Sequence, residues 1–339
     1  MRIGLTYDLK EAVPKKQSQP EDALEEYDSN ETVGGIAAAL ESLGHSTVRI
    51  GGGRIFLANI QKESVDLVFN IAEGLGNYRS REAQVPGVLE MLDIHYTGSD
   101  PQCLAICLDK PLTKELVAAE GVAVPCSRVI GGMDDLENTD WTAFPFPVFL
   151  KPVHEGSSMG IRTGSKIDSP DELSRALTAL LEKYHQPVMV EEFIYGDEVT
   201  VGVVGNSPPR IIAIMRVLPR KADANFVYSL EVKRDWERLV DYEVPANLEP
   251  SVLRNIEQSA LKAFSVLGCR DVSRVDFRVS REGTPYFLEI NPLPGLNPKS
   301  GDIVIMSGRM GWSYPSLISA MVDAAVKRYE SESQSSPNL

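Results

Sequence analysis

Four polar side chains lie in two neighbouring apolar segments near the end of the chain. PYFLEIN places Glu289 and Asn291 two residues apart, and SRVDFRVS does the same with Arg274 and Asp276. Because side chains alternate between the faces of a strand, each pair points to one face. Glu282-Gly283 between the segments predicts a β-hairpin turn, with Asp276 opposite Glu289 and Arg274 opposite Asn291.

Two carboxylates and an amide on one face suit a hard divalent cation. Mg²⁺ takes oxygen ligands, usually one or two carboxylates together with phosphate oxygens of a nucleotide. The hairpin therefore predicts a metal site at Asp276, Glu289 and Asn291. An exposed hairpin face that carries a salt bridge is the alternative.

A second candidate is the stretch KPVHEGSSMG, in which Lys151 ends an apolar strand and a loop of small residues follows. Small residues such as Ser157 and Ser158 let backbone N–H groups approach phosphate oxygens, and a lysine adds a point charge. The pattern is not the GxxxxGK[ST] phosphate loop, and a plain turn after a strand is the alternative.

A third candidate is VMVEEFIYGDEV, in which Glu191 and Glu192 end an apolar strand before Phe193 and Ile194. Main-chain groups there can recognise an adenine edge, and Glu198 can accept hydrogen bonds from ribose hydroxyls. Without the other motifs, the segment is also typical of an ordinary edge strand.

The composition limits the class of protein. The 339 residues include 48 Asp and Glu against 34 Lys and Arg, a formal net charge of −14, which disfavours nucleic acid and anionic membranes as partners. The N-terminus lacks a basic start with an apolar core, and no apolar run is long enough to span a bilayer, so we expect a cytoplasmic protein. The four cysteines lack a paired CxxC pattern, and we expect core thiols.

Strand and helix patterns alternate in the first part of the chain. RIGLTYDL, STVRIG and VDLVFNIAEG are predicted strands, and ETVGGIAAALESLGH is a predicted helix that ends at Gly44. This order indicates an α/β unit with a parallel sheet. The polar segment 10–30 is predicted to be a surface insertion after the first strand, where such folds bind ligands.

The motifs occur in the order found in one family. The chain resembles the ATP-grasp enzymes, and within them the D-alanine–D-alanine ligase family, through YTGSDPQCLAICLDKPLTK, FPVFLKPVHEGSSMGI, VEEFIYGDEVTVGVVG, SRVDFR, YFLEINPLPGL and MGWSYPSLI. The resemblance implies an α/β fold with an N-terminal parallel domain at 1–105, a central lid at 106–188 and a C-terminal antiparallel unit at 189–330. The tail, 331–339, is expected to be disordered.

The resemblance also implies a two-step reaction. A carboxylate attacks the γ-phosphate of ATP to give an acyl phosphate, and an amine then displaces phosphate to form an amide. Arg274 would stabilise the oxyanion, Lys233 would approach the γ-phosphate, and Ser157 would belong to the loop over the phosphates. The nucleotide would be held by Lys110, Lys151, Ser157, Ser158, Glu191, Glu192, Phe193, Ile194, Glu198 and Leu288. Two Mg²⁺ ions, with Mn²⁺ as an alternative, would be bound by Asp276, Glu289 and Asn291.

The departures from the family lie where amino-acid substrates should bind. The family's N-terminal Gly-Gly-x-Ser-x-Glu is replaced by LTYDLKEAV. Glu31 or Asp28 would supply the missing charge, unless Glu31 only favours the dipole of the next helix. The family's His-Gly is Glu73-Gly74, where a carboxylate can receive an amine, and Arg79 and Arg81 follow as candidates for a substrate carboxylate.

Two further departures lie in the second half of the chain. The family's Lys-Tyr pair is Lys233-Arg234, and its Ser-Leu is Ser300-Gly301 after Lys299. The predicted substrate-binding residues are Glu31, Glu73, Arg234, Gly295, Lys299, Ser300 and Gly301.

Three functions remain open from the sequence. The first is an ATP-dependent carboxylate–amine ligase that acts on another pair of amino acids or amino-acid-like substrates. The second is a divergent D-alanine–D-alanine ligase, and the third is a nucleotide-binding protein without turnover. We expect small-molecule substrates, no nucleic-acid or membrane partner, and a homodimer, because relatives commonly form one.

Overall fold

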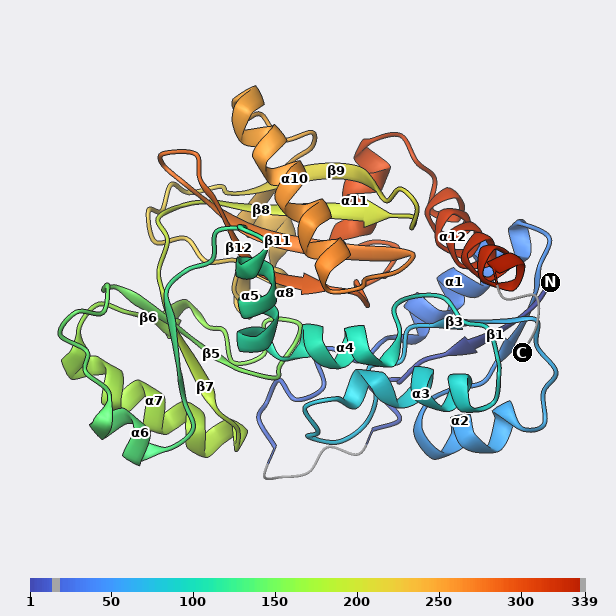
Figure 1. Cartoon of the computed structure of the whole chain (residues 1–339), viewed down its shortest axis with the longest axis horizontal. Helices are drawn as coiled ribbons and strands as arrows, with labels where there is room; N and C mark the ends of the chain where they lie inside the picture. Colours follow the sequence, from blue (N-terminus) through green and yellow to red (C-terminus); the bar gives the residue numbers. More distant parts are fainter. Residues whose placement is uncertain (14–18, 336–339) are drawn as a thin grey trace.

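Three β-sheets, each from a separate stretch of chain, form the framework of the molecule (Figure 1). The computed structural model describes residues 1–13 and 19–335. The first sheet has the order β2-β1-β3 and is parallel, as predicted. Its elements, with the helices of the same region, are β1 (Arg2–Thr6), α1 (Asn30–Ser42), β2 (Ser46–Arg49), α2 (Gly53–Ile60), β3 (Leu67–Asn70), η1 (Arg81–Ala83) and α3 (Gln84–Met91).

Helix α1 lies where its sequence predicts, although its last residue, Ser42, comes two residues before the predicted end at Gly44. Ser29 lies at its N-cap, and the side chain accepts a hydrogen bond from the Thr32 backbone N–H at 3.2 Å. Gly44 follows the last turn with a φ of +84°, which a glycine adopts without strain.

The second sheet is antiparallel and has the order β4-β7-β5-β6. It lies with its two helices at the lower left of Figure 1, away from the first sheet. The chain reaches it through α4 (Pro101–Leu108) and α5 (Lys110–Ala119), and its elements are β4 (Ser127–Ile130), α6 (Met133–Asn138), β5 (Val148–Pro152), η2 (Thr163–Ser165), β6 (Lys166–Ile167), α7 (Pro170–Tyr184) and β7 (Val188–Glu192).

The third sheet is antiparallel, with the order β10-β9-β8-β11-β12. Helix α12 returns to pack beside α1, so apolar residues of both chain ends share one core (Figure 1). The elements of this region are β8 (Gly196–Val204), β9 (Arg210–Pro219), α8 (Leu230–Arg234), α9 (Trp236–Leu239), β10 (Val240–Glu243), α10 (Pro250–Val266), β11 (Val272–Ser280), β12 (Pro285–Asn291), α11 (Asp302–Arg309) and α12 (Tyr314–Ser335).

The predicted hairpin register is confirmed: Asp276 pairs with Glu289 and Arg274 with Asn291. The register then shifts, so that Phe277 pairs with Phe287 and Leu288 is left as an extra residue. Because of this irregularity Leu288 and Glu289 line the same cavity, which strict alternation along β12 would not allow.

Three boundaries differ from the sequence predictions. Helix α12 continues to Ser335, so 331–335 are helical and the prediction of disorder is wrong there, while 336–339 lie outside the described residues. The expected limit at 188/189 would cut β7, which pairs with β4 and β5, and that at 105/106 would cut α4. We therefore propose that the central unit extends to Glu192.

The segment 10–30 is not simply a surface insertion. Residues 14–18 lie outside the described part, but Asp22 is fully buried and Leu24 nearly so. The segment instead covers part of the candidate site.

Candidate functional site

Two adjoining cavities lie where the loops of the three sheets meet. The larger has a volume of about 420 Å³ and the smaller about 90 Å³. Lys233, Arg274 and Glu289 line both cavities, so the two form one continuous site.

The hairpin face lies between the cavities. Arg274 donates to Asp276 through Nε at 3.0 Å and Nη2 at 2.8 Å, and the Thr200 hydroxyl donates to Asp276 at 2.6 Å. Asn291 donates to Asp276 through Nδ2 at 3.2 Å, which leaves its amide oxygen free of that contact. Three oxygen-bearing side chains therefore share one face, as the sequence predicts for Asp276, Glu289 and Asn291.

Glu289 is a carboxylate surrounded by cations. Burial disfavours its charged form, but the positive charges of Lys110, Lys151, Lys233 and Arg274 outweigh burial and lower its pKa to about 2. The Lys110 Nζ lies 3.9 Å from its carboxylate. Glu289 is thus ionised throughout the physiological range, as a cation ligand must be.

The predicted phosphate lysines are both buried. Lys110 is the first residue of α5 and donates to the carbonyl oxygen of Glu155, and Lys151 lies on β5. Glu191 on β7 lies 2.8 Å from both Lys151 and Lys114. Its carboxylate therefore pairs with two lysines. The sequence had predicted that Glu191 contacts adenosine and did not predict this pairing.

Lys114 was missed by sequence reasoning. It is buried, and it donates to the Phe287 carbonyl oxygen at 2.9 Å. Burial is the largest effect on its pKa, which is lowered to about 8 even with Glu191 beside it. Its position four residues after Lys110, on the same helix face, was the available signal.

The smaller cavity collects the other residues predicted to hold adenosine. Its lining includes Ser158, Glu192, Phe193, Ile194, Glu198 and Leu288. Arg278, which sequence reasoning missed, organises this cavity by donating to the Ile194 carbonyl at 2.6 Å and to Glu198 at 2.7 Å. Its guanidinium also lies 4.6 Å from the centre of the Phe193 ring. The period-two pattern Arg274, Asp276, Arg278 was the signal.

The Gly- and Ser-rich loop is tightly folded. Ser157 and Ser158 have φ angles of +48° and +59°, and a Cβ at Gly160 would lie 2.5 Å from Pro152. The Gly160 N–H donates to the buried Asp22 carboxylate at 3.1 Å. The N-terminal insertion thus fixes the predicted phosphate loop, through a residue that sequence reasoning did not single out.

Helix α8 carries Lys233 and Arg234. Lys233 faces both cavities, as expected for a residue that approaches the γ-phosphate. Arg234 lines the larger cavity but forms an ion pair with Glu25 of the insertion at 2.6 Å. Arg234 is therefore paired with Glu25 in this structure, and its contact with a substrate stays a prediction.

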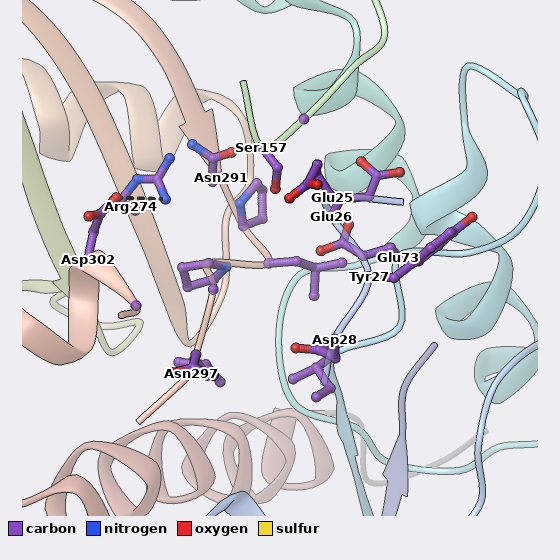
Figure 2. A pocket seen from close by; sticks show the side chains of 18 of the residues that line it. Glu25, Glu26, Tyr27, Asp28, Glu73, Ser157, Arg274, Asn291, Asn297 and Asp302 are labelled. Carbon is purple, nitrogen blue, oxygen red and sulfur yellow. Dashed lines mark ion pairs between the residues drawn. The ribbon is translucent and has the colours of Figure 1, made fainter. Parts of the chain in front are cut away.

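The larger cavity has two chemically different sides (Figure 2). Arg274, Asn291 and Asp302 lie on one side, and Glu25, Glu26, Tyr27, Asp28 and Glu73 on the other. Glu73 therefore lies where the sequence predicts, whereas Arg81 is not available for a substrate carboxylate. It forms two hydrogen bonds to Glu26, at 2.7 and 2.8 Å, and a third at 2.8 Å to the His154 carbonyl oxygen.

The predicted substrate residues after β12 divide into two groups. Gly295, Ser300 and Gly301 line the larger cavity, together with Asn297, which sequence reasoning missed. Glu31 and Lys299 do not line it: they form an ion pair with each other at the exposed surface. The side chain of Lys299 is 77% exposed, so these two predictions are not supported by the geometry.

The expectation of core thiols is confirmed for three of the four cysteines, whereas Cys126 is exposed. The core between α4 and the third sheet contains Cys103, Cys107 and Cys269. The Cys103 Sγ lies 3.8 Å from the Cys107 Sγ and 3.6 Å from the Cys269 Sγ. All four cysteines are free thiols. Within the described part of the chain, no helix combines the length and the apolar character needed to cross a membrane.

Comparisons with known proteins agree on one family. Residues 119–323 match the family model described as the D-ala D-ala ligase C-terminus. The chain is 33% identical over 289 residues to the D-alanine–D-alanine ligase of Aquifex aeolicus, a match that covers 85% of this chain and 92% of the relative.

Solved structures show the same fold. The D-alanine–D-alanine ligase of Bacillus anthracis, crystallised with ATP, superposes with a TM-score of 0.75 at 22% identity, over 98% of this chain and 99% of the other. The VanG D-Ala:D-Ser ligase of Enterococcus faecalis gives 0.69 at 21% identity, over 96% and 99%.

Proposed function

Because the chain belongs to the D-alanine–D-alanine ligase family, we propose that it uses ATP to join the carboxylate of one amino-acid-like substrate to the amine of another. The observation that carries the proposal is the position of Arg274. It lines both the smaller cavity, which we assign to the nucleotide, and the larger cavity, which we assign to the substrates.

The reaction is a phosphoryl transfer followed by an acyl transfer. The carboxylate of the first substrate attacks the γ-phosphorus of ATP, ADP leaves, and the amine of the second substrate then displaces phosphate from the acyl phosphate. Such transfers depend mainly on positioning and on neutralising charge. Lys110, Lys151 and Lys233 supply positive charge, and Arg274 donates to the oxyanion of the tetrahedral intermediate.

The hairpin face fits divalent cations, because Asp276, Glu289 and Asn291 offer only oxygen ligands on that side and Glu289 stays ionised. Two Mg²⁺ ions, with Mn²⁺ as a substitute, would be held there, and bound cations would neutralise phosphate charge. Asp276 is already oriented for this role by Thr200 and Arg274.

The substrates are the finer part of the proposal. Glu73, Arg234 and Gly301 occupy positions where the family pattern has other residues, which favours a substrate pair other than two D-alanines. The identity to D-alanine–D-alanine ligases favours the second candidate, formation of D-alanyl-D-alanine itself.

Location and assembly complete the proposal. Cys103 contacts both Cys107 and Cys269 without a disulfide, and this feature and a reaction that consumes ATP support a cytoplasmic location. A homodimer is supported because relatives commonly form one, and sedimentation of the purified protein tests this.

Release of ADP by the purified protein tests the function. D- and L-amino acids are supplied singly and in pairs with Mg²⁺ and ATP, and the products are identified by mass. Release with D-alanine alone, together with D-alanyl-D-alanine, would establish the second candidate. Release only with another pair would establish the first, and binding of ATP without release in any mixture would contradict both.

A further inference from the structure

The larger cavity has an acidic side that we call the carboxylate wall, formed by Glu25, Glu26, Asp28, Glu73 and Glu82. The first three lie on the segment between β1 and α1, Glu73 follows β3, and Glu82 lies in η1. Figure 2 shows that the labelled members of this wall face the cavity opposite Arg274. Three separate pieces of the chain thus bring carboxylates to one surface.

Two members of the wall have cationic partners. Arg81 binds both carboxylate oxygens of Glu26, and Glu25 pairs with Arg234 at 2.6 Å and with Lys10 at 3.1 Å. These two carboxylates are therefore neutralised by the protein itself.

The other three members have no such partner. Across residues 1–13 and 19–335, the carboxylates of Asp28, Glu73 and Glu82 form no side-chain hydrogen bond and no ion pair. Glu82 is only 8% exposed and still lines the cavity. A buried carboxylate without a partner is costly in its charged form, so these groups need either protons or a cationic ligand.

The pKa values of these three carboxyl groups agree with this geometry. Burial raises the pKa of Asp28 to about 7 and that of Glu82 to about 8, and Asp8 and Glu26 respectively add to the rise. Burial, followed by the charges of Glu82, Glu26 and Asp28, raises the pKa of Glu73 well above its usual range. The charges of Arg81 and Lys110 act in the opposite direction at Glu82.

Arg274 on the opposite side does not balance the wall. Arg274 is committed to Asp276 and lies 3.5 Å from Asp302. One substrate ammonium would neutralise one carboxylate and leave two without a cation. We propose that one substrate carries at least two cationic nitrogens, as a diamino acid or diamine does, and that Asp28, Glu73 and Glu82 bind them. This inference rests on the proposed function, because it assigns the substrate class of the same site.

The cavity has room for such a molecule. Its volume of about 420 Å³ lies within the range of ~300–1,000 Å³ usual for small-molecule sites. An extended chain with a carboxylate at the Arg274 side and ammonium groups at the wall would match the charges of both sides.

The test compares lysine with norleucine, which has the same backbone and nearly the same length but no side-chain ammonium. Binding of both enantiomers of each, and of putrescine, is measured by titration calorimetry on the full chain with Mg²⁺ and a non-hydrolysable ATP analogue. We expect a diamino ligand to bind at least ~10-fold more tightly than norleucine, since each well-placed charge pair contributes more than ~1.4 kcal/mol. Equal affinities, or tighter binding of norleucine, would overturn the inference.

Two variants locate the effect. Glu82→Gln and Glu73→Gln should each weaken binding of the diamino ligand more than binding of norleucine, whereas Glu115→Gln on the exposed face of α5 should change neither. Repeating the calorimetry in buffers of different ionisation enthalpy should show proton release when the dication binds. Equal losses for both ligands, or no proton release, would contradict the assignment.

ADP release separates this inference from the proposed function. Turnover with neutral amino acids, without preferential binding of dications, would leave the ligase intact and overturn the substrate class. Preferential binding of dications without ADP release in any mixture would support the wall as a cation site and contradict the ligase.

Discussion

Replacing Glu191 by glutamine tests the buried charge cluster beneath the nucleotide site. Glu191 is 2% exposed and lies 2.8 Å from both Lys114 and Lys151, which are themselves buried. Removing one partner of a buried ion pair typically costs ~3–5 kcal/mol, because the remaining charge is left without compensation. Here two lysines lose the same partner.

Deprotonation of Lys114 limits the loss in the free energy of unfolding. The pKa of Lys114 is already lowered to about 8 by burial, and without Glu191 it falls further, so the lysine becomes neutral in the folded variant near pH 7. We therefore expect Glu191→Gln to lower the free energy of unfolding by about 3 kcal/mol at neutral pH. A lysine with a folded pKa below its unfolded value destabilises the folded state less as pH rises. The loss should therefore shrink between about pH 6 and pH 9.

Urea unfolding of both proteins at several pH values measures the effect. The double variant Glu191→Gln/Lys114→Met should recover part of the lost stability, because it removes one uncompensated charge. Glu192→Gln, at the next position, is the matched control and should stay near wild type. A loss below about 1 kcal/mol, or one that does not change with pH, would refute the assigned cluster.

Three further predictions follow from the cavities. Glu289→Ala should lower kcat by at least ~100-fold at saturating Mg²⁺ and ATP, and unchanged ADP release would contradict the metal face. Asp28→Asn should raise the free energy of unfolding by about 2 kcal/mol near pH 8. The raised pKa of Asp28 corresponds to ~4 kcal/mol, and we halve this value because the cavity admits water. A folded carboxyl pKa above the unfolded value makes wild-type stability fall as pH rises from about 4 to 7, so the gain should vanish near pH 4 in denaturation curves. Arg278→Lys should raise the KM for ATP about 10-fold, because an ammonium cannot reproduce three guanidinium contacts, and an equal change in the amino-acid KM would argue against its placement.

Local patterns predicted the parts of the site that lie on regular elements. The hairpin register followed from alternation and a Glu-Gly turn, and Lys151 followed from a motif at the end of a predicted strand. Lys110 followed from the family resemblance. Glu73 was found because Glu73-Gly74 stands after the third predicted strand, where the family has His-Gly.

Long-range contacts set the parts that sequence reasoning missed. Asp22 binds the Gly160 N–H across 138 residues, and Arg81 is held by Glu26 rather than left open to substrate. Such pairings depend on how the insertion folds over the cavity, and no periodicity records them. Glu31 and Lys299 do not line the cavity for the same reason, since both face solvent and form an ion pair with each other.

Transfer of oxygen from substrate to phosphate tests the central claim most directly. An acid substrate labelled with ¹⁸O in its carboxylate is incubated with the protein, Mg²⁺, ATP and the amine substrate, and the released phosphate is analysed by mass. An acyl-phosphate route past Arg274 places one labelled oxygen in the phosphate for each amide formed, together with ADP. Amide formation with unlabelled phosphate, or with AMP and pyrophosphate, would contradict the account.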